Sequence, residues 1–345
     1  MSKAVYINGI GTISPQVTFG DVPFLETPKE ITGNRLTCIE PEYTGWIDPK
    51  AIRRMSRVIR MGVASAAMAL KEAGLDKPDA IITGTAFGCL EDTGIFLTKM
   101  IENNEHALNP TPFIQSTHNT IGSQVALLLQ CQGYNQTYSH RAFSFEHSLL
   151  DALMMLEEKS LSVLVGGVDE VTDHSFSIMN RFGLYKDESK IDGIIQGEGA
   201  SYFLLSGEKG NNTYARIINL ATLYKPIDVI EIQKWIKTFL TNQSLNANDV
   251  DLILLGSNGD VAKDSVYSEV ISSVFSNATH GVFKHLCGEY QTSNAFAMWT
   301  AAKILKDGKI PSTILKHGAS QNPKRILIYN QHLGSHHSLI LLESC

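Results

Sequence analysis

The sequence has few cysteines, and none of them is spaced like a metal ligand or a redox pair. The 345 residues include five cysteines and no C-x-x-C motif: Cys38, Cys89, Cys131, Cys287 and Cys345. An odd number of scattered cysteines fits a reducing compartment and argues against a disulfide framework or a zinc site. We therefore expect a cytoplasmic protein without a bound metal.

Long apolar runs and an excess of positive charge are also missing. No apolar run approaches the roughly 20 residues of a membrane span. The first residues, MSKAVYINGIG, lack the apolar core of a signal peptide. The net charge of −6 gives no electrostatic reason to expect nucleic acid or a membrane surface as a partner. With 43% hydrophobic and 19% charged residues, the composition is that of an ordinary globular protein with a large core or two lobes.

The most informative stretch covers residues 133–156, GYNQTYSHRAFSFEHSLLDALMML. Residues 134–139 alternate aromatic and polar side chains and predict a strand. From Phe143 onwards, apolar residues recur at spacings of three and four and predict a helix. The corner between them is His140-Arg141-Ala142. A helix amino terminus at such a corner can stabilise negative charge and often follows a nucleophile, yet Ala142 has no reactive group.

Strands and helices alternate along the rest of the chain, which favours an α/β fold with buried sheets. We expect strands at residues 5–11, 80–85, 161–171, 202–206, 215–223, 252–255, 282–286, 325–329 and 338–342. Helices are expected at residues 52–73, 93–106, 227–240, 266–275 and 292–305, with one more that ends at residue 129.

Several short motifs together resemble the β-ketoacyl synthases of the thiolase superfamily. They are the strand–corner–helix at 134–156, GGVDE at 166–170, GEGA at 197–200 and the K-x-x-x-G spacing at 284–288. The resemblance implies a thiolase-like, duplicated α/β/α/β/α five-layer fold. It places one half at residues 1–210 and the other at 211–345, packed as one compact unit.

The same resemblance implies that the catalytic groups of the family are absent. Condensation in that family needs a thiolate, two histidines and an oxyanion hole. Here Ala142 falls at the cysteine, Ser257 or Asn258 at the first histidine, and Glu289 at the second. The family lysine is kept as Lys284, and no cofactor or metal is implied. We therefore expect no catalytic residue.

The resemblance further implies a subunit of the chain-length-factor type. Such a subunit pairs with an active β-ketoacyl-ACP synthase as a heterodimer and shapes its acyl tunnel in polyketide, aryl polyene or fatty-acid-like biosynthesis. An acyl chain and an acyl carrier protein would be its other partners. The residues expected at the tunnel and interface are Phe113, Gln115, Thr117, His118, Thr120, Tyr134, Tyr138 and His140.

Two other functions stay open. The pocket could serve an acyltransferase or hydrolase that uses Ser144 or a water activated by Glu289, although a serine in a first helical turn is usually a cap. The chain could also be a stand-alone module that binds acyl groups or a carrier protein.

His140 and Arg141 could bind a carboxylate or phosphate, or could satisfy backbone carbonyls instead. Cys287 fits an inert core residue, and His332, His336 and His337 fit a solvated or pocket-lining loop.

Overall fold

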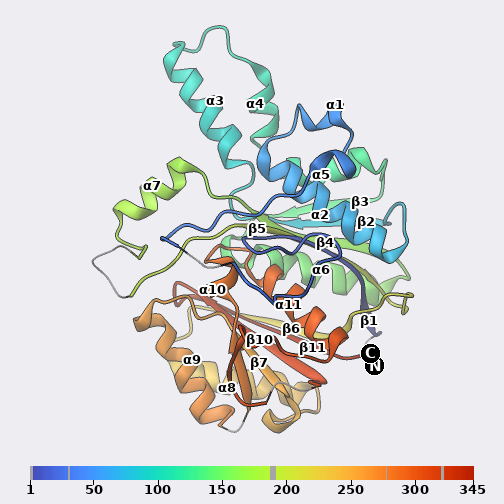
Figure 1. Ribbon diagram of the computed structural model, residues 1–345, viewed down its shortest axis with the longest axis vertical. Helices are drawn as coiled ribbons and strands as arrows, with labels where there is room; N and C mark the ends of the chain where they lie inside the picture. Colours follow the sequence, from blue (N-terminus) through green and yellow to red (C-terminus); the bar gives the residue numbers. More distant parts are fainter. Residues whose placement is uncertain (1–2, 30–31, 187–191, 277, 320–321) are drawn as a thin grey trace.

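The computed structural model describes residues 3–29, 32–186, 192–276, 278–319 and 322–345 (Figure 1). Its strands are β1 (Val5–Ile13), β2 (Ala80–Gly84), β3 (Tyr134–Tyr138), β4 (Ser162–Asp169), β5 (Gly199–Ser206), β6 (Ala215–Tyr224), β7 (Leu252–Leu255), β8 (Thr279–Val282), β9 (Leu315–His317), β10 (Arg325–His332) and β11 (His336–Glu343). Its α-helices are α1 (Pro49–Ile52), α2 (Arg57–Ala73), α3 (Leu90–Glu102), α4 (Pro110–Gln115), α5 (Thr120–Leu128), α6 (Ser144–Glu158), α7 (Asp173–Arg181), α8 (Val229–Asn242), α9 (Val261–Val274), α10 (Lys284–Cys287) and α11 (Asn294–Asp307).

The strand order repeats itself in the two parts of the chain. The strands follow the order β3-β2-β4-β5-β1-β6-β11-β10-β7-β8-β9. In the first part β3, β2 and β4 are parallel and β5 is antiparallel to β4. In the second part β8, β7 and β10 are parallel and β11 is antiparallel to β10. Strands β1 and β6 join the two parts by antiparallel pairing.

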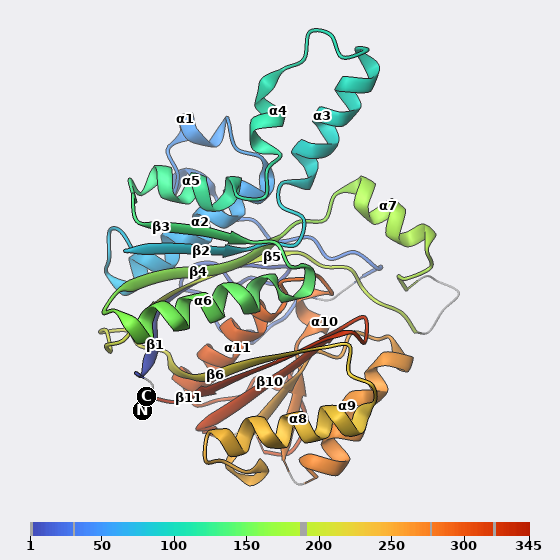
Figure 2. The same cartoon turned by 180° about the vertical axis from the view of Figure 1, so that it is seen from behind.

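Helices form three layers around these strands (Figures 1 and 2). Helices α2 and α5 cover the outer face of the first part, and α8 and α9 cover the outer face of the second. Helices α6 and α11 lie between the parts, where α11 packs on strands from both. The expected five-layer, thiolase-like α/β fold is therefore confirmed. The predicted division at residue 210 falls in the segment between β5 and β6 and remains a prediction.

Close packing of β1 against α2 explains the two glycines near the amino terminus. A Cβ atom on Gly9 would lie 2.0 Å from the Ala69 carbonyl oxygen, and one on Gly11 would lie 2.1 Å from that of Ser65. Only glycine permits this approach. Gly9-Ile10-Gly11 therefore serves helix–strand packing.

Two predicted elements differ from the structure. The helix expected at 52–73 is two helices, because α1 ends at Ile52 and α2 begins only at Arg57. The strand expected at 282–286 is wrong: β8 ends at Val282, and α10 follows from Lys284. A short apolar run does not by itself distinguish strand from helix. Here the helical turn brings Lys284 back towards Glu289, which a strand would not do.

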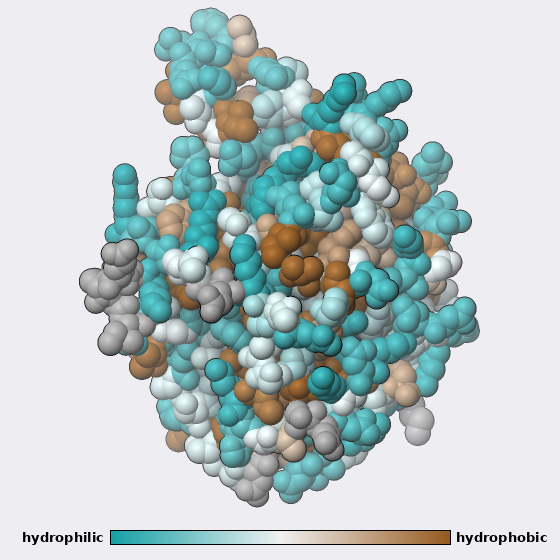
Figure 3. Space-filling model, in the orientation of Figure 1, coloured by the Kyte–Doolittle hydropathy of each residue, from teal (hydrophilic) through white to brown (hydrophobic). Residues whose placement is uncertain are grey.

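Helices α3 and α4 project from the body as an arm (Figure 1). Phe96 and Phe113 pack within the arm with ring centroids 5.1 Å apart. Ile101 and Ile114 of the same arm are 75% and 67% exposed, and hydrophobic residues are visible on it in Figure 3. Among the described residues, no helix has the length and apolar character needed to cross a bilayer.

Candidate functional site

The corner between β3 and α6 is a tight and strained turn. Arg141 takes a left-handed conformation with φ of 54°, and residues Arg141–Phe143 form a 3₁₀ turn before α6 begins. A non-glycine residue in this region is strained, as in the strand-to-helix elbows that present nucleophiles. The strained residue is Arg141, whereas Ala142 beside it is buried. Neither side chain is a nucleophile. The corner therefore offers no nucleophile at the position of the family cysteine, whether that position is Arg141 or Ala142.

Ser144 is fully engaged in holding the corner. Its hydroxyl accepts a hydrogen bond from the His140 amide at 2.9 Å and donates one to the Arg141 carbonyl at 2.6 Å. The side chain is buried. These bonds commit the hydroxyl proton to the backbone, as in a structural cap.

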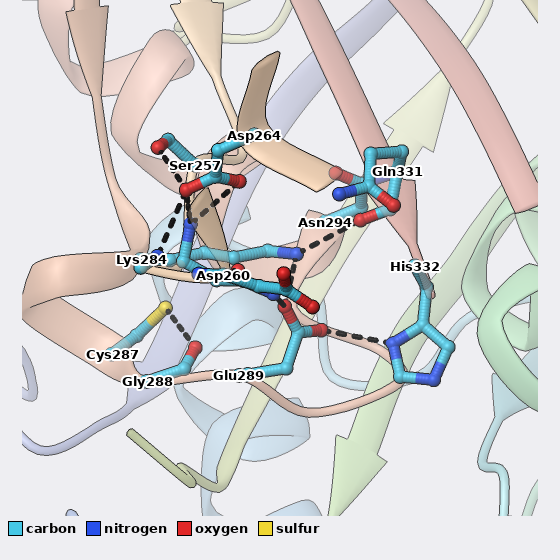
Figure 4. A network of polar contacts seen from close by, with 12 residues as sticks. Ser257, Asp260, Asp264, Lys284, Cys287, Gly288, Glu289, Asn294, Gln331 and His332 are labelled. Carbon is cyan, nitrogen blue, oxygen red and sulfur yellow. Dashed lines mark hydrogen bonds and ion pairs between the residues drawn. The ribbon is translucent and has the colours of Figure 1, made fainter. Parts of the chain in front are cut away.

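A closed ion-pair cluster occupies the region where the resemblance places the family histidines (Figure 4). We call Asn258, Lys284, Glu289 and His332 the ion-pair cluster. Lys284 Nζ lies 2.6 Å from Glu289 Oε2, and Asn258 Nδ2 donates to the same oxygen at 2.6 Å. His332 Nδ1 lies 3.0 Å from Glu289 Oε1. Both carboxylate oxygens of Glu289 therefore have polar partners within the protein.

Glu289 is ionised despite its burial. Burial alone would raise the pKa of its carboxyl group, but Lys284 and His332 outweigh this effect and lower the pKa to about 2. Lys284 is itself buried, and its ammonium also donates to the Gln331 carbonyl at 3.3 Å. The cluster is thus a buried charge pair whose charges balance each other.

The two residues proposed for the first histidine position have different partners. Ser257 points towards α9, where its hydroxyl donates to Asp264 Oδ2 at 2.6 Å. Asn258 instead reaches Glu289. The sequence alone grouped His332 with two other histidines. No local pattern separates it from them, because its contact with Glu289 joins residues that are 43 positions apart.

The ion-pair cluster presents an ionised carboxylate in place of a neutral imidazole. Two neutral imidazoles would donate to a developing enolate, whereas ionised Glu289 would repel it. Cys287, next to the cluster, is buried, and burial raises the pKa of its thiol well above the usual value. A buried neutral thiol is a poor nucleophile. Among the described residues, no three metal-ligating side chains are grouped so that they could hold a metal ion.

The acids of the GGVDE and GEGA motifs hold loops together. Asp169 accepts hydrogen bonds from the Ala86 amide at 2.8 Å and from the Thr292 hydroxyl at 2.8 Å, which ties two distant segments. Burial raises the pKa of Asp169 to about 6, although these hydrogen bonds oppose the shift. Glu198 is buried and forms a two-pronged ion pair with Arg57 at 2.7 and 2.5 Å. These structural roles were not predicted from the sequence.

Three of the eight residues predicted for the tunnel and interface line one groove, and the other five lie outside its lining. A groove of about 830 Å³ lies between α1, α4 and α5, and it is lined by Gln115, Thr117 and Thr120. Its apolar lining includes Met55, Ile114, Leu127 and Leu128. Phe113 is 56% exposed on the arm, outside this lining. His118 packs over Gly88, away from the same lining.

Tyr134, Tyr138 and His140 mark the open edge of the sheet. Strand β3 is the outermost strand of the described order, and its residues are exposed or half-buried. Tyr134 donates its hydroxyl to Asp151 Oδ2 at 2.9 Å, and the Tyr138 ring lies 5.6 Å from the His140 ring. Unpaired backbone groups on such an edge are available to another strand.

Comparison with known proteins agrees with this description. Residues 36–182 match the family model described as "Beta-ketoacyl synthase, N-terminal domain". The chain is 20% identical to 3-oxoacyl-[acyl-carrier-protein] synthase 2 of Staphylococcus aureus (strain N315), in an alignment covering 94% of this chain and 90% of that protein.

Solved structures show the same fold over the whole chain. The ishigamide ketosynthase/chain length factor superposes with a TM-score of 0.81 at 18% identity, covering all of both chains. The ketosynthase ApeO in complex with its chain length factor ApeC, from Xenorhabdus doucetiae, superposes with a TM-score of 0.80 at 15% identity, covering 99% of this chain and 98% of that one. Residues 36–182 therefore resemble the amino-terminal domain of β-ketoacyl synthases, and the whole chain shares the fold of these ketosynthase and chain length factor structures.

Proposed function

We propose that this chain is a non-catalytic ketosynthase-like subunit that pairs with an active β-ketoacyl-ACP synthase and shapes its acyl tunnel. The pair would act in the cytoplasm on acyl chains carried by an acyl carrier protein, in polyketide, aryl polyene or fatty-acid-like biosynthesis. Similar folds occur in a ketosynthase in complex with its chain length factor and in a type II polyketide ketosynthase in complex with its acyl carrier protein. These likenesses support the kind of complex proposed.

The ion-pair cluster is the observation that carries the proposal. The resemblance puts Ser257 or Asn258 and Glu289 at the positions of two histidines, and Lys284 neutralises Glu289. The corner presents Arg141 and Ala142 in place of a thiol. A ketosynthase-like fold that lacks several catalytic groups fits a subunit that acts by binding a partner through its surface.

Exposed apolar side chains beside β3 support a partner at this edge. Leu127 of α5 is 69% exposed, and Leu150 and Met154 of α6 are also exposed. Both helices pack against β3. A sheet edge flanked by apolar side chains promotes aggregation of a free monomer, whereas a stable dimer can bury it.

The acyltransferase or hydrolase alternative has weaker support. Ser144 uses its hydroxyl to hold the corner, and both oxygens of Glu289 are bound by protein groups. A carboxylate with a pKa of about 2 is also a weak base for activating water. A stand-alone binding module remains the second candidate, because it would need the same scaffold but no ketosynthase partner.

The first prediction concerns association. Co-expressed with an active ketosynthase of the same organism, the chain should elute as a heterodimer burying more than about 2,000 Å². Leu127→Asp combined with Met154→Asp should shift the complex to free subunits, since two charges would be buried without partners. Ile230→Asp on α8, where Ile230 is 68% exposed, is the matched control. Light scattering that finds a stable monomer with every available ketosynthase would favour the stand-alone module.

The second prediction concerns product length. Phe113→Ala should lengthen the products of the reconstituted pair, and Thr117→Trp should shorten them. Excess volume in a packed site costs about 1–3 kcal/mol, which slows the next extension roughly 5- to 150-fold. Phe182→Ala is the control, because Phe182 follows α7 and is 74% exposed. An unchanged product distribution from an intact complex would leave this segment without a role in chain length.

The third prediction concerns chemistry. Neither Ala142→Cys nor Arg141→Cys should restore condensation of an acyl thioester with a malonyl thioester. The thiol would lack two imidazole donors, and Glu289 would oppose the enolate charge. Mass spectrometry after incubation with acyl-carrier thioesters separates acylation from condensation. Sustained turnover by either single variant would show that the assignment of Ser257 or Asn258 and of Glu289 to the family histidine positions is wrong.

A further inference from the structure

Two histidine rings face each other on strands β8 and β9. His280 of β8 and His317 of β9 are direct cross-strand partners, so both side chains lie on the same face of this antiparallel pair. Their ring centroids are 5.4 Å apart, and the ring planes are inclined by only 25°. Helices α10 and α11 separate the two residues in the chain, so strand pairing brings them together.

The hydrogen bonding of His280 leaves one of its ring nitrogens open. Its Nδ1 lies 3.4 Å from the Ala278 carbonyl oxygen. Because a carbonyl only accepts, Nδ1 carries the proton in a neutral ring, and the lone pair is then on Nε2. Within the described part of the chain, no other hydrogen bond or ion pair involves the ring of His280 or of His317. A neutral imidazole with an open nitrogen is the form that binds metal ions.

The pair is accessible at the end of the sheet that lies opposite β3. His317 is exposed and His280 is half-buried. Strand β9 ends the described strand order, whereas β3 begins it. The sheet edge that we assign to a ketosynthase partner is therefore at the other end, and solutes can reach the histidine pair in the free chain.

The spacing of the rings suits one metal ion held by two imidazoles. Zinc binds a histidine nitrogen at about 2.0–2.1 Å, so two such nitrogens around one ion lie at most about 4 Å apart. Rings whose centroids are 5.4 Å apart can bring their nitrogens to that distance by small rotations of the side chains. Imidazole ligands suit zinc, copper and nickel, whereas calcium and magnesium prefer oxygen ligands.

We propose that His280 and His317 bind one divalent transition-metal ion, such as zinc, as a two-histidine clip across β8 and β9. Water would complete the coordination, since among the described residues no third ligating side chain is grouped with the pair. The cysteine spacing argues against a thiolate zinc site, and this site uses imidazoles alone. An ion that binds only the folded chain stabilises it, so the clip would hold the edge strand β9 in place. The inference does not rest on the proposed function.

Isothermal titration calorimetry of the untagged full-length chain with zinc chloride tests the site. All proteins carry Cys345→Ser, which removes the exposed thiol at the carboxyl terminus. We expect one saturable site in this parent chain. His280→Gln and His317→Gln should each weaken zinc binding by about 100-fold, because the second imidazole no longer binds within the same chelate. Zinc should also raise the melting temperature of the parent chain more than that of His317→Gln.

Two histidines outside the pair provide matched controls. His106 is an exposed imidazole after α3, and His147 forms a different pair with His140, in which the Nδ1 atoms lie 2.6 Å apart. His106→Gln and His147→Gln should bind zinc as the parent chain does. Binding that is unchanged in His317→Gln, or that His147→Gln abolishes, would place the ion elsewhere and overturn the proposal. Absence of saturable zinc binding, or an equal rise in melting temperature in His317→Gln, overturns it as well.

Discussion

Lys284→Met is expected to lower the free energy of unfolding by about 3–5 kcal/mol, because it leaves the charge of Glu289 buried and unpaired. Lys284 Nζ is 2.6 Å from Glu289 Oε2, and both side chains are almost completely buried. Methionine has a similar length and no charge, so the loss reports mainly on the broken pair. Denaturant unfolding followed by circular dichroism at pH 7 measures the change.

The double variant Lys284→Met with Glu289→Gln is the matched control. Removing both charges eliminates the unpaired carboxylate, and the new amide at this position could still bond to Asn258 and His332. The double variant should therefore recover most of the lost stability. With Glu289→Gln measured alone as well, the three changes in stability give the coupling energy of the pair. A loss below about 1 kcal/mol in the single variant would mean that water reaches Glu289, so that the cluster is not closed.

Glu146→Gln is expected to stabilise the protein at neutral and alkaline pH. Burial raises the pKa of Glu146 from the usual 4.5 to about 7, although hydrogen bonds from Asn294 and Ser338 oppose the shift. The native fold therefore favours the protonated carboxyl group. The contribution of this group to stability is complete below pH 4.5 and is lost as the pH rises from 4.5 to 7. The predicted loss is about 3 kcal/mol at alkaline pH.

Paired pH profiles of unfolding test this prediction. Burial also raises the pKa of Glu170 to about 7, so the native protein should lose stability over the same range for more than one reason. Glu146→Gln should remove only the part of the pH dependence of stability that comes from Glu146. The difference in the free energy of unfolding between the variant and the native protein should therefore grow from about pH 4.5 to about pH 8. Glu170→Gln serves as a comparison variant outside the surroundings of Glu146. Parallel profiles of the native protein and Glu146→Gln would show that Glu146 is solvated.

The elements with strong local patterns could be predicted from the sequence. The periodic apolar residues of α6 and α11, and the apolar runs of β10 and β11, identify these elements without any tertiary information. The run at 282–286 could not be assigned in this way. Its conformation depends on where Lys284 finds a buried partner, and that partner lies after the next turn.

The sequence could predict which chemical groups the candidate site lacks, but not which contacts its residues make. The absence of a thiol at the corner is visible in the residues themselves. The choice between Ser257 and Asn258 is not, because adjacent residues after a strand point in different directions and only their partners distinguish them. The strain at Arg141 is likewise a property of the turn that joins β3 to α6, rather than of the arginine.

The α/β alternation and the chemical identity of the groups at the corner and near Glu289 follow from the sequence alone, since periodicity and residue type are local properties. That Asn258, Lys284, Glu289 and His332 form one closed cluster follows only from the folded chain. The physical reason is that strand pairing between distant segments brings β7, β8 and β10 side by side, and α10 follows directly after β8. Whether a buried charge is neutralised depends on those contacts, which no local pattern encodes.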